Sequence, residues 1–509
     1  MKTNIVIVGG GASCISFIYS FIKNKKHLNK KSTITIVEKL KEFGPGNAYV
    51  DDLSSNILNT KAEFITAIGD KPGDFFQWLT MNKDKWTQKF PSLEITKSTY
   101  APRALFGLYM RDTFESVCEI ASDAGVTINK LNSEVIDVHE QKNGSMQVYL
   151  KDGEVLCTDK IILACGTQNR SQNGLPETQA IINNPYPTAK LKHEVDSADD
   201  VAIIGARLSA IDTVIALIES GHKGKITIFS RSGHFPYVRG SQGRYKNQFL
   251  NRGYIEQHFD SLTLKDLMAL YKKEEFSYYY RNPECKIELL PVMSGKIDDL
   301  TSFVDTEIKK SINLRAWQAI LYDTNPCIEF IWNKLTEKDK KQFFDDFYAK
   351  AISLRVSIPK ENAEKILSYL ESSQLSFVTG SQKITPLIDS VNIRTEQYNG
   401  HFDKVIYAVG SPRKVKEMDS VLLNNMVLNG IVKEHPYGGL VVEDTTYGVV
   451  NRDGEISTSV YAVGEITSGQ FIFTSAMDII VRHASSCAKN LGDSQLAPLY
   501  QKSAEPIEN

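Results

Sequence analysis

A glycine turn near the start of the chain has the spacing of a phosphate-binding loop. Three glycines are followed by three small residues, in the order Gly9, Gly10, Gly11, Ala12, Ser13 and Cys14. The first and third glycines would let the backbone approach a pyrophosphate, and the free amides at the start of the next helix would bind that anion. Cys14 replaces the last glycine of the G-x-G-x-x-G pattern, where a small thiol still fits a helix-strand contact. The turn predicts dinucleotide binding through Gly9, Gly11, Ala12 and Ser13.

Glu38 supplies the second part of this site. It ends a predicted strand, Ser32–Glu38, and a carboxylate at that position accepts hydrogen bonds from the ribose hydroxyls of an adenosine. The elements before it are a β-branched strand, Ile5–Val8, and a helix that continues to about Ile22. Together they give the β-α-β order that a Rossmann unit requires.

A second turn keeps only part of the motif. Gly205 is the first glycine, Arg207 occupies the second position, and Leu208 and Ser209 would begin the helix. Arg207 could block a pyrophosphate or clamp it as a bidentate donor, and we favour the clamp. After the next strand comes Arg231, which can meet a 2′-phosphate where an acidic residue would favour NAD. This turn therefore predicts NADPH.

Strands and helices at the right intervals surround the second turn. Val201–Ile204 and Lys225–Phe229 are predicted strands, and Ser209–Ser220 is a predicted helix between them. Two further predicted strands run into glycine and would close the two units, at 160–166 and 404–410, and a third, at 459–464, precedes Glu465 and a predicted apolar helix. Two Rossmann units in one chain imply two nucleotides.

The stretch from Ser241 to Gln374 differs in character and is predicted to be a mainly helical insertion. Aromatic and charged residues recur there at helical spacing, within Leu262–Lys273, Leu314–Leu335 and Asn362–Leu370. The predicted domains are the FAD-binding domain at 1–197 and 411–509, the NADPH-binding domain at 198–240 and 375–410, and the insertion at 241–374.

Bulk composition excludes several classes of protein. At 509 residues the chain is long enough for about three structural units. The net charge of −2 provides no field for nucleic acid or an anionic membrane. Seven scattered cysteines include no Cys-x-x-Cys pair, which argues against a zinc site or a dithiol centre. We expect no metal, no signal peptide and no membrane span, and a soluble, cytoplasmic protein acting on a small molecule.

Several blocks resemble a known family, the bacterial FAD/NAD(P)-binding proteins related to flavin-dependent amino-acid N-hydroxylases. More distantly, they resemble Baeyer-Villiger-type monooxygenases. Gly44 to Tyr49 followed by Leu58-Asn59 is similar to a G-x-G-x-x-Y…L-N segment. Tyr100 to Arg111 is similar to a P-R…G-x-Y block. The other similar blocks are Gly205 to Asp212, Ser230 to Gly233, and the helical run Trp317 to Leu335.

The resemblance implies a fold class and a chemistry. The fold is α/β, with two Rossmann-type dinucleotide-binding domains of the class B flavin monooxygenase kind and a mainly helical insertion. The implied function is an FAD-dependent, NADPH-consuming monooxygenase that hydroxylates the nitrogen of a small amino acid or amine through a peroxyflavin. The substrates would be that small molecule and molecular oxygen, and the surface pattern is compatible with a homo-oligomer.

The resemblance also suggests individual residues. Asn59 and Arg103 come from blocks expected near the flavin ring and are the candidate catalytic contacts, with a structural hydrogen-bonding role as the alternative. Gly46 would lie beside the FAD. Gly464-Glu465 stands where many such flavoproteins have Gly-Asp, whose carboxylate holds a ribityl hydroxyl. Cys14, Arg207 and Glu465 depart from the family pattern.

Two rival hypotheses remain open from the sequence. One is an FAD oxidoreductase that passes electrons to a carrier or quinone without oxygenation. The other is a flavin-binding sensor or scaffold without catalytic activity, in which Arg207 has disabled the second nucleotide site.

Overall fold

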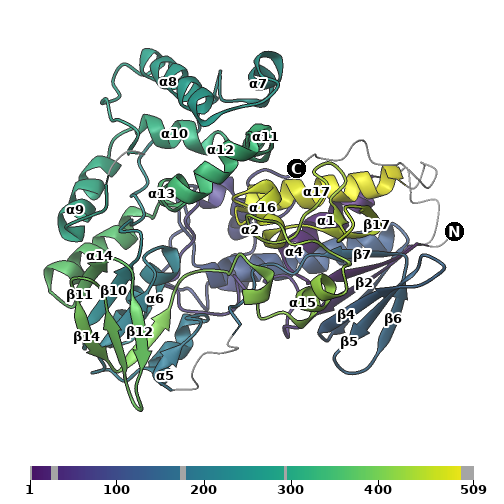
Figure 1. The fold of residues 1–509 in the computed structure, drawn as a ribbon, viewed down its shortest axis with the longest axis horizontal. Helices are drawn as coiled ribbons and strands as arrows, with labels where there is room; N and C mark the ends of the chain where they lie inside the picture. The colour runs from purple at the N-terminus through teal and green to yellow at the C-terminus, as the bar shows by residue number, and fades with distance from the viewer. Residues whose placement is uncertain (1–2, 25–31, 172–178, 292–294, 495–509) are drawn as a thin grey trace. The chain divides into compact units, whose positions relative to one another are not determined.

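The computed structural model describes residues 3–24, 32–171, 179–291 and 295–494 (Figure 1). The chain divides into two compact units that are each assembled from separate stretches of sequence. Unit 1 comprises 1–50, 60–171 and 412–509, and unit 2 comprises 51–59 and 172–411. Each unit is described by itself below.

Unit 1 is built on a six-stranded sheet with the order β16-β17-β7-β1-β2-β3. Neighbouring strands of this sheet pair in parallel, except for β16 and β17, which are antiparallel. The strands are β1 (Thr3–Val8), β2 (Ser32–Glu38), β3 (Val126–Asn132), β7 (Lys160–Leu163), β16 (Gly448–Val450) and β17 (Ile456–Ala462). The central strand β1 ends in four buried residues, as expected for a strand covered on both faces.

Helices from both ends of the sequence pack together in unit 1. The helix α1 (Ala12–Lys23) lies against α17 (Met477–Ser494) and α4 (Arg103–Asp123) (Figure 1). Residues Ser13 to Ile22 of α1 are all buried, so this helix is enclosed on every side. The remaining helices are η2 (Ala62–Phe64), α2 (Asp74–Met81), α3 (Lys83–Trp86), η7 (Val415–Glu417), α15 (Val421–Leu428), η8 (Glu465–Thr467) and α16 (Ser468–Phe471). A small antiparallel sheet holds β4 (Val135–Glu140), β5 (Met146–Leu150) and β6 (Val155–Thr158).

Unit 2 repeats the parallel pattern in a five-stranded sheet with the order β11-β10-β9-β15-β8. The strands are β8 (Ile181–Ile182), β9 (Val201–Ile204), β10 (Ile226–Ser230), β11 (Leu375–Thr379) and β15 (Lys404–Tyr407). Ile203 of β9 packs in one core with residues of α6 (Leu208–Glu219) and α14 (Lys360–Glu371). Its neighbour Ile204 packs in another core with Ile393 and Phe402. Because side chains alternate along a strand, helices cover one face of this sheet and the second core covers the other.

The second core is closed by a small antiparallel sheet of three strands, in the order β12-β13-β14. These strands are β12 (Lys383–Pro386), β13 (Val391–Arg394) and β14 (Asn399–Phe402). Between β8 and β9, η3 (Thr188–Lys190) leads into α5 (Leu191–Glu194). Asp52 accepts hydrogen bonds from the amides of Thr188 and Ala189, which ties 51–59 to this unit.

The predicted insertion consists of helices in its described part. They are α7 (Arg252–His258), α8 (Leu264–Arg281), α9 (Leu300–Ser311), α10 (Ala316–Tyr322), η5 (Asn325–Cys327), α11 (Ile328–Lys334), α12 (Glu337–Gln342), the π-helical η6 (Phe343–Phe347), α13 (Tyr348–Arg355) and α14. The predicted run Leu314–Leu335 is broken into α10 and α11. Pro326 explains the break, since it lacks an amide hydrogen and its ring obstructs a continuous helix.

The α/β fold class predicted from the sequence is confirmed. Ser32–Glu38 and Val201–Ile204 are strands with the predicted bounds, and the closing strands β7 and β15 pair directly beside β1 and β9. Residues 179–197, which the sequence grouped with the first domain, fall in unit 2, where β8 extends the sheet beside β15.

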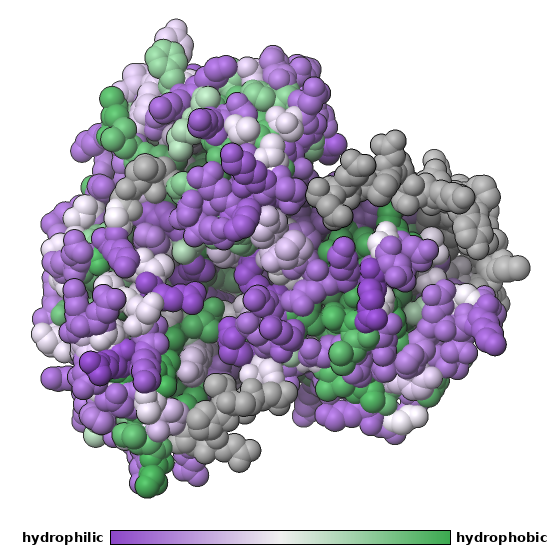
Figure 2. All heavy atoms as spheres, viewed as in Figure 1, coloured by the Kyte–Doolittle hydropathy of each residue, from purple (hydrophilic) through white to green (hydrophobic). Residues whose placement is uncertain are grey.

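The visible face is mostly hydrophilic, and its apolar residues form several separate areas (Figure 2). None of the helices in the described ranges is long and apolar enough to cross a membrane. Among the same residues, no group of three or more His, Cys, Asp or Glu side chains could hold a metal ion.

Candidate functional site

The first glycine turn lies at the end of β1 in unit 1. Gly9 has φ +104°, and a Cβ added there would lie 2.3 Å from the carbonyl oxygen of Ala164, just after β7. Its amide donates to Val37 of β2. Both the backbone angle and this close approach require glycine.

The helix start beside this turn can receive an anion. The first backbone hydrogen bond of α1 runs from the Ile15 amide to the Gly11 carbonyl, so the amides of Ala12, Ser13 and Cys14 precede the helical ladder. A Cβ added to Gly11 would lie 3.5 Å from the Cα of Gly46. Gly11 and Gly46 thus face each other, and a side chain on either residue would fill the space beside them. The backbone of the turn and the free amides at the start of α1 therefore fit a pyrophosphate.

Glu38 lies directly beside the glycine turn. Its Oε2 accepts from the Gly10 amide at 2.7 Å, and its Oε1 accepts from the Leu40 amide at 2.8 Å. The residue is only 6% exposed. Each carboxylate oxygen has a further lone pair, so the fixed carboxylate can still accept from a ribose.

Cys14 is buried in the first turn of α1. Burial raises the pKa of its thiol well above the usual value, with smaller contributions from Cys118 and Glu38. The thiol is therefore neutral, and its environment is that of a packing residue rather than a nucleophile.

The C-terminal segment meets this site from a distant part of the sequence. A Cβ added to Gly464 would lie 3.0 Å from the Oγ of Ser13. Next to it, Glu465 accepts a hydrogen bond from Thr474 Oγ1 at 3.0 Å. Burial raises the pKa of the Glu465 carboxyl above its usual value. The hydrogen bond from Thr474 and the positive charge of Arg413 lower that pKa by less. Gly464 and Glu465 thus lie at the first glycine turn.

Arg413 and Thr474 were missed by the sequence analysis. Arg413 donates from Nε to the Tyr437 carbonyl at 2.8 Å, which fixes its guanidinium near Glu465. Thr474 follows two non-glycine residues with positive φ, Ile472 at 47° and Phe473 at 53°. Such angles cost free energy and cluster at functional sites. No sequence motif marks either residue, because both reach Glu465 only through the tertiary fold.

Two of the blocks that resemble the N-hydroxylase family pack against each other in unit 1. A Cβ added to Gly44 would lie 2.7 Å from the carbonyl oxygen of Met110. A Cβ added to Gly107 would lie 1.9 Å from the carbonyl oxygen of Tyr49. The rings of Tyr49 and Phe106 meet edge to face at 4.6 Å. These contacts hold the loop after β2, including Gly46, against α4.

Arg103 and Asn59 belong to different units. Arg103 begins α4 in unit 1, and its positive charge lowers the pKa of the Tyr49 hydroxyl, although burial raises that pKa by more. Asn59 lies in the segment that belongs to unit 2, next to the buried Leu58. Their shared role at a flavin therefore stays a prediction.

The second glycine turn reproduces the backbone of the first. Gly205 has φ +115°, its amide donates to Phe229 of β10, and an added Cβ would lie 2.4 Å from the Ala408 carbonyl oxygen. Arg207 caps α6 with φ −110° and ψ −160°, close to the −89° and −154° of Gly11. An arginine adopts these angles without strain. Its Nη2 donates to the Ala349 carbonyl at 3.3 Å.

The start of α6 has fewer amides available to a ligand. The amides of Ala210 and Ile211 both donate to the Arg207 carbonyl, which leaves those of Leu208 and Ser209 ahead of the ladder. Within α6, Asp212 accepts a 2.6 Å hydrogen bond from the Tyr186 hydroxyl.

Strand register identifies the counterpart of Glu38 in unit 2. Val8 pairs with Val37, and Ile204 pairs with Phe229, so Ser230 occupies the position of Glu38. Arg231 follows and is exposed. Among the described residues, its side chain makes no hydrogen bond or ion pair. The acid of the first unit is thus replaced by a serine and an accessible arginine.

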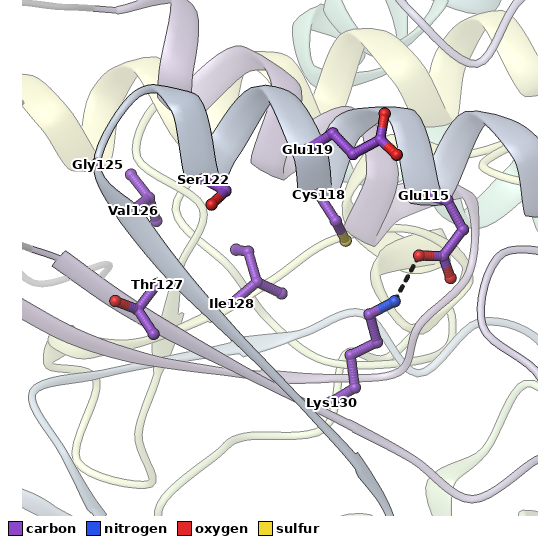
Figure 3. A pocket seen from close by; sticks show the side chains of 9 residues that line it. All are labelled: Glu115, Cys118, Glu119, Ser122, Gly125, Val126, Thr127, Ile128 and Lys130. Atoms are coloured by element: carbon purple, nitrogen blue, oxygen red, sulfur yellow. Dashed lines mark hydrogen bonds and ion pairs between the residues drawn. The ribbon is translucent and has the colours of Figure 1, made fainter.

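A separate pocket of about 530 Å³ lies between α4 and β3 (Figure 3). It is lined by Glu115, Cys118, Glu119, Ser122, Gly125, Val126, Thr127, Ile128 and Lys130. Lys130 and Glu115 form an ion pair across it, and burial raises the pKa of Cys118 to about 11. None of the candidate site residues line this pocket, so we assign it no role in the chemistry.

Comparison with known proteins supports the assignment of the first turn. Residues 6–168 match the FAD-NAD(P)-binding family, so this part of the chain is an FAD/NAD(P)-binding domain and the predicted cofactor class is confirmed. No curated protein matches the chain in sequence.

Solved structures share the fold over nearly the whole chain. An ornithine hydroxylase from Pseudomonas aeruginosa has a TM-score of 0.53 and 13% identity, with 97% of this chain and 100% of that chain covered. An ornithine N-hydroxylase from Kutzneria sp. 744, with reduced FAD, NADP⁺ and L-ornithine, has a TM-score of 0.54 and 12% identity at the same coverage. An L-lysine 6-monooxygenase from Pseudomonas syringae has a TM-score of 0.53 and 11% identity, with 97% of this chain and 99% of that chain covered. The fold is that of the N-hydroxylating flavoproteins.

Proposed function

We propose that the protein is an FAD-dependent monooxygenase that consumes NADPH and hydroxylates the nitrogen of a small amino acid or amine. The observation that carries this proposal is the pair of equivalent glycine turns with different residues at the same strand position. Glu38 suits the ribose of FAD, whereas Ser230 and Arg231 suit the 2′-phosphate of NADPH. The shared fold with N-hydroxylases supports the choice of reaction.

In unit 1 the residues around the first turn would hold FAD. Gly9, Gly11 and the amides of Ala12 and Ser13 would bind its pyrophosphate, with Gly46 on the opposite side. Glu38 would accept from the ribose. FAD supplies the hydride-accepting and oxygen-activating chemistry, so the protein's part is binding, orientation and exclusion of water.

Glu465 would act at the ribityl chain. Thr474 orients its carboxylate, and the burial that raises its pKa also excludes water from that part of the site. Glutamate is one methylene longer than the aspartate of related flavoproteins.

In unit 2, Gly205, Leu208 and Ser209 would bind NADPH through the backbone at the start of α6. Arg207 would clamp the pyrophosphate, and its extended backbone angles leave the turn undistorted. Arg231 would meet the 2′-phosphate. Asn59 and Arg103 would make polar contacts with flavin or substrate, each from its own unit.

The substrate test is an aerobic assay of the purified holoenzyme with NADPH and a panel of ornithine, lysine and cadaverine under ¹⁸O₂. We expect one amine to yield a hydroxylamine that carries one labelled oxygen, in a ratio of about one to each NADPH oxidised. Turnover of NADPH with a quinone acceptor and no labelled product would identify the non-oxygenating oxidoreductase instead. Absence of any NADPH oxidation would favour the sensor or scaffold.

A further inference from the structure

Cationic side chains gather beside the start of α6 in unit 2. Burial, followed by the positive charges of Lys350, Arg207 and Lys296, lowers the pKa of His234 to about 4. These residues come from the N-cap of α6, the loop after β10, the segment before α9, and α13. The fold therefore assembles this cluster, which no local sequence pattern marks.

Lys350 is the most buried member of the cluster. It is 5% exposed, and its Nζ lies 5.5 Å from the centre of the Tyr237 ring. Burial lowers its pKa, because a charged ammonium is disfavoured in an apolar environment. The π-helical segment η6 ends directly before α13, and π-helical turns occur frequently at functional sites.

The cluster is connected to the glycine turn by the backbone. The guanidinium of Arg207 donates to the carbonyl of Ala349, the residue before Lys350. At the end of α13, the Ile358 amide donates to Tyr237, and the Arg239 amide donates to Ile358. These bonds join the segment that carries His234 to the helix that carries Lys350.

His234 has an unused buried nitrogen. Its Nδ1 is buried and makes no hydrogen bond to any described part of the chain. A buried polar atom without a partner costs free energy, and such atoms in native structures call for an explanation. An anion at this place would satisfy that nitrogen and would compensate the surrounding positive charge.

We propose that Arg207, His234 and Lys350 form a binding site for the diphosphate group of a nicotinamide dinucleotide, so that the helical insertion completes the cofactor site. This inference rests on the proposed use of NADPH in unit 2. The start of a 12-residue helix is where a Rossmann unit binds pyrophosphate, whereas the 2′-phosphate would lie at the strand end with Arg231. The cluster thus adds two residues, His234 and Lys350, to the predicted set.

The test is calorimetric titration of FAD-loaded protein with inorganic pyrophosphate, NADP⁺ and 2′,5′-ADP. We expect Lys350→Met to weaken pyrophosphate and NADP⁺ binding at least tenfold, because one charge-assisted contact is lost. Lys350→Arg should recover most of the affinity. The matched control is Lys272→Met, which makes the same change on an exposed position of α8 and should leave both affinities within twofold.

Stability separates this role from a structural one. Methionine removes a buried charge at nearly constant volume, so Lys350→Met should keep or raise the melting temperature while it lowers affinity. Unchanged pyrophosphate affinity in Lys350→Met would overturn the inference. Because these titrations need no turnover, a protein whose flavin NADPH cannot reduce, but whose pyrophosphate binding depends on Lys350, would refute the proposed function and leave this site standing.

Discussion

The two glycine turns have the same backbone and different side chains. Gly9 and Gly205 both have positive φ, and both approach the carbonyl oxygen that follows the adjacent strand, at Ala164 and Ala408. At the helix cap, Gly11 faces another glycine, whereas the guanidinium of Arg207 reaches the insertion. In our proposal the first turn would bind an anion with backbone amides, and the second would add cationic side chains.

The residues at the ends of the second strands differ in the same direction. Glu38 presents a carboxylate held by two amides, whereas the equivalent Ser230 is followed by the accessible Arg231. A carboxylate selects hydroxyl donors, and a guanidinium selects phosphate. Under the proposed function, one backbone would thus serve two different dinucleotides through few substitutions.

The largest expected effect comes from adding a methyl group to either first glycine. Gly9→Ala should lower bound flavin more than tenfold, since positive φ costs about 1–3 kcal/mol and the backbone overlap costs more. Gly205→Ala should keep its flavin and lose NADP⁺ binding. Flavin absorbance per chain measures the bound flavin of each variant, and titration with NADP⁺ measures its affinity for that nucleotide. Loss of flavin from Gly205→Ala alone would reverse the assignment of the two turns.

The next largest effect concerns the choice of nicotinamide cofactor. Arg231→Ser should reduce the preference for NADPH over NADH by about 10- to 100-fold, because charge-assisted bonds to phosphate contribute about 1.5–3 kcal/mol. The ratio of the two rates of flavin reduction measures this preference. Arg394→Ser changes another exposed arginine of unit 2 and should leave the ratio unaltered. The same shift in both variants would mean that Arg231 does not read the 2′-phosphate.

A smaller effect is expected at the ribose. Glu38→Gln should weaken flavin binding about tenfold, because a neutral amide accepts hydrogen bonds less strongly than a carboxylate. Equilibrium dialysis of FAD measures the change. Glu42→Gln is the matched control, since Glu42 pairs with Arg111 on the surface and should alter affinity less than twofold. Equal losses in the two variants would assign Glu38 a structural role only.

The smallest effect is on stability. The pKa of His234 is about 4 in the folded chain and ordinarily 6.5, so the unfolded state binds more protons between these values. The contribution of the neutral His234 ring to the free energy of unfolding is fully present above pH 6.5 and is lost as the pH falls toward 4. Between pH 7 and pH 5, the free energy of unfolding of His234→Gln should therefore fall by about 1 kcal/mol less than that of the parent. This figure is already reduced for the solvent screening of a partly exposed ring. Urea unfolding at both pH values measures this difference, and identical losses would contradict the lowered pKa.

The sequence predicted the elements whose signal is local. Strands 32–38 and 201–204 were found with the predicted bounds because β-branched runs end there in a turn or a charged residue. The helix predicted through Ile22 ends at Lys23. The predicted strand 160–166 ends at Leu163 instead, and Gly166 then has a positive φ that no strand continues through.

The parts of the candidate sites that the sequence missed depend on tertiary contacts. Arg413 and Thr474 meet Glu465 only through the folding of the segments before and after β17. Lys350 and His234 are separated by several helices in the sequence and meet beside Arg207. Neither group has the fixed spacing that allowed the glycine turns to be recognised.

Anaerobic reduction of the bound flavin tests whether two different dinucleotides bind to the protein and react with each other, as we propose. NADPH and NADH are mixed separately with the FAD-loaded protein in a stopped-flow spectrometer, and oxygen is then admitted. We expect rapid bleaching of the flavin by NADPH, much slower bleaching by NADH, and a transient absorbing species before the oxidised flavin returns. A colourless purified protein, or a flavin that NADPH leaves oxidised, would contradict it.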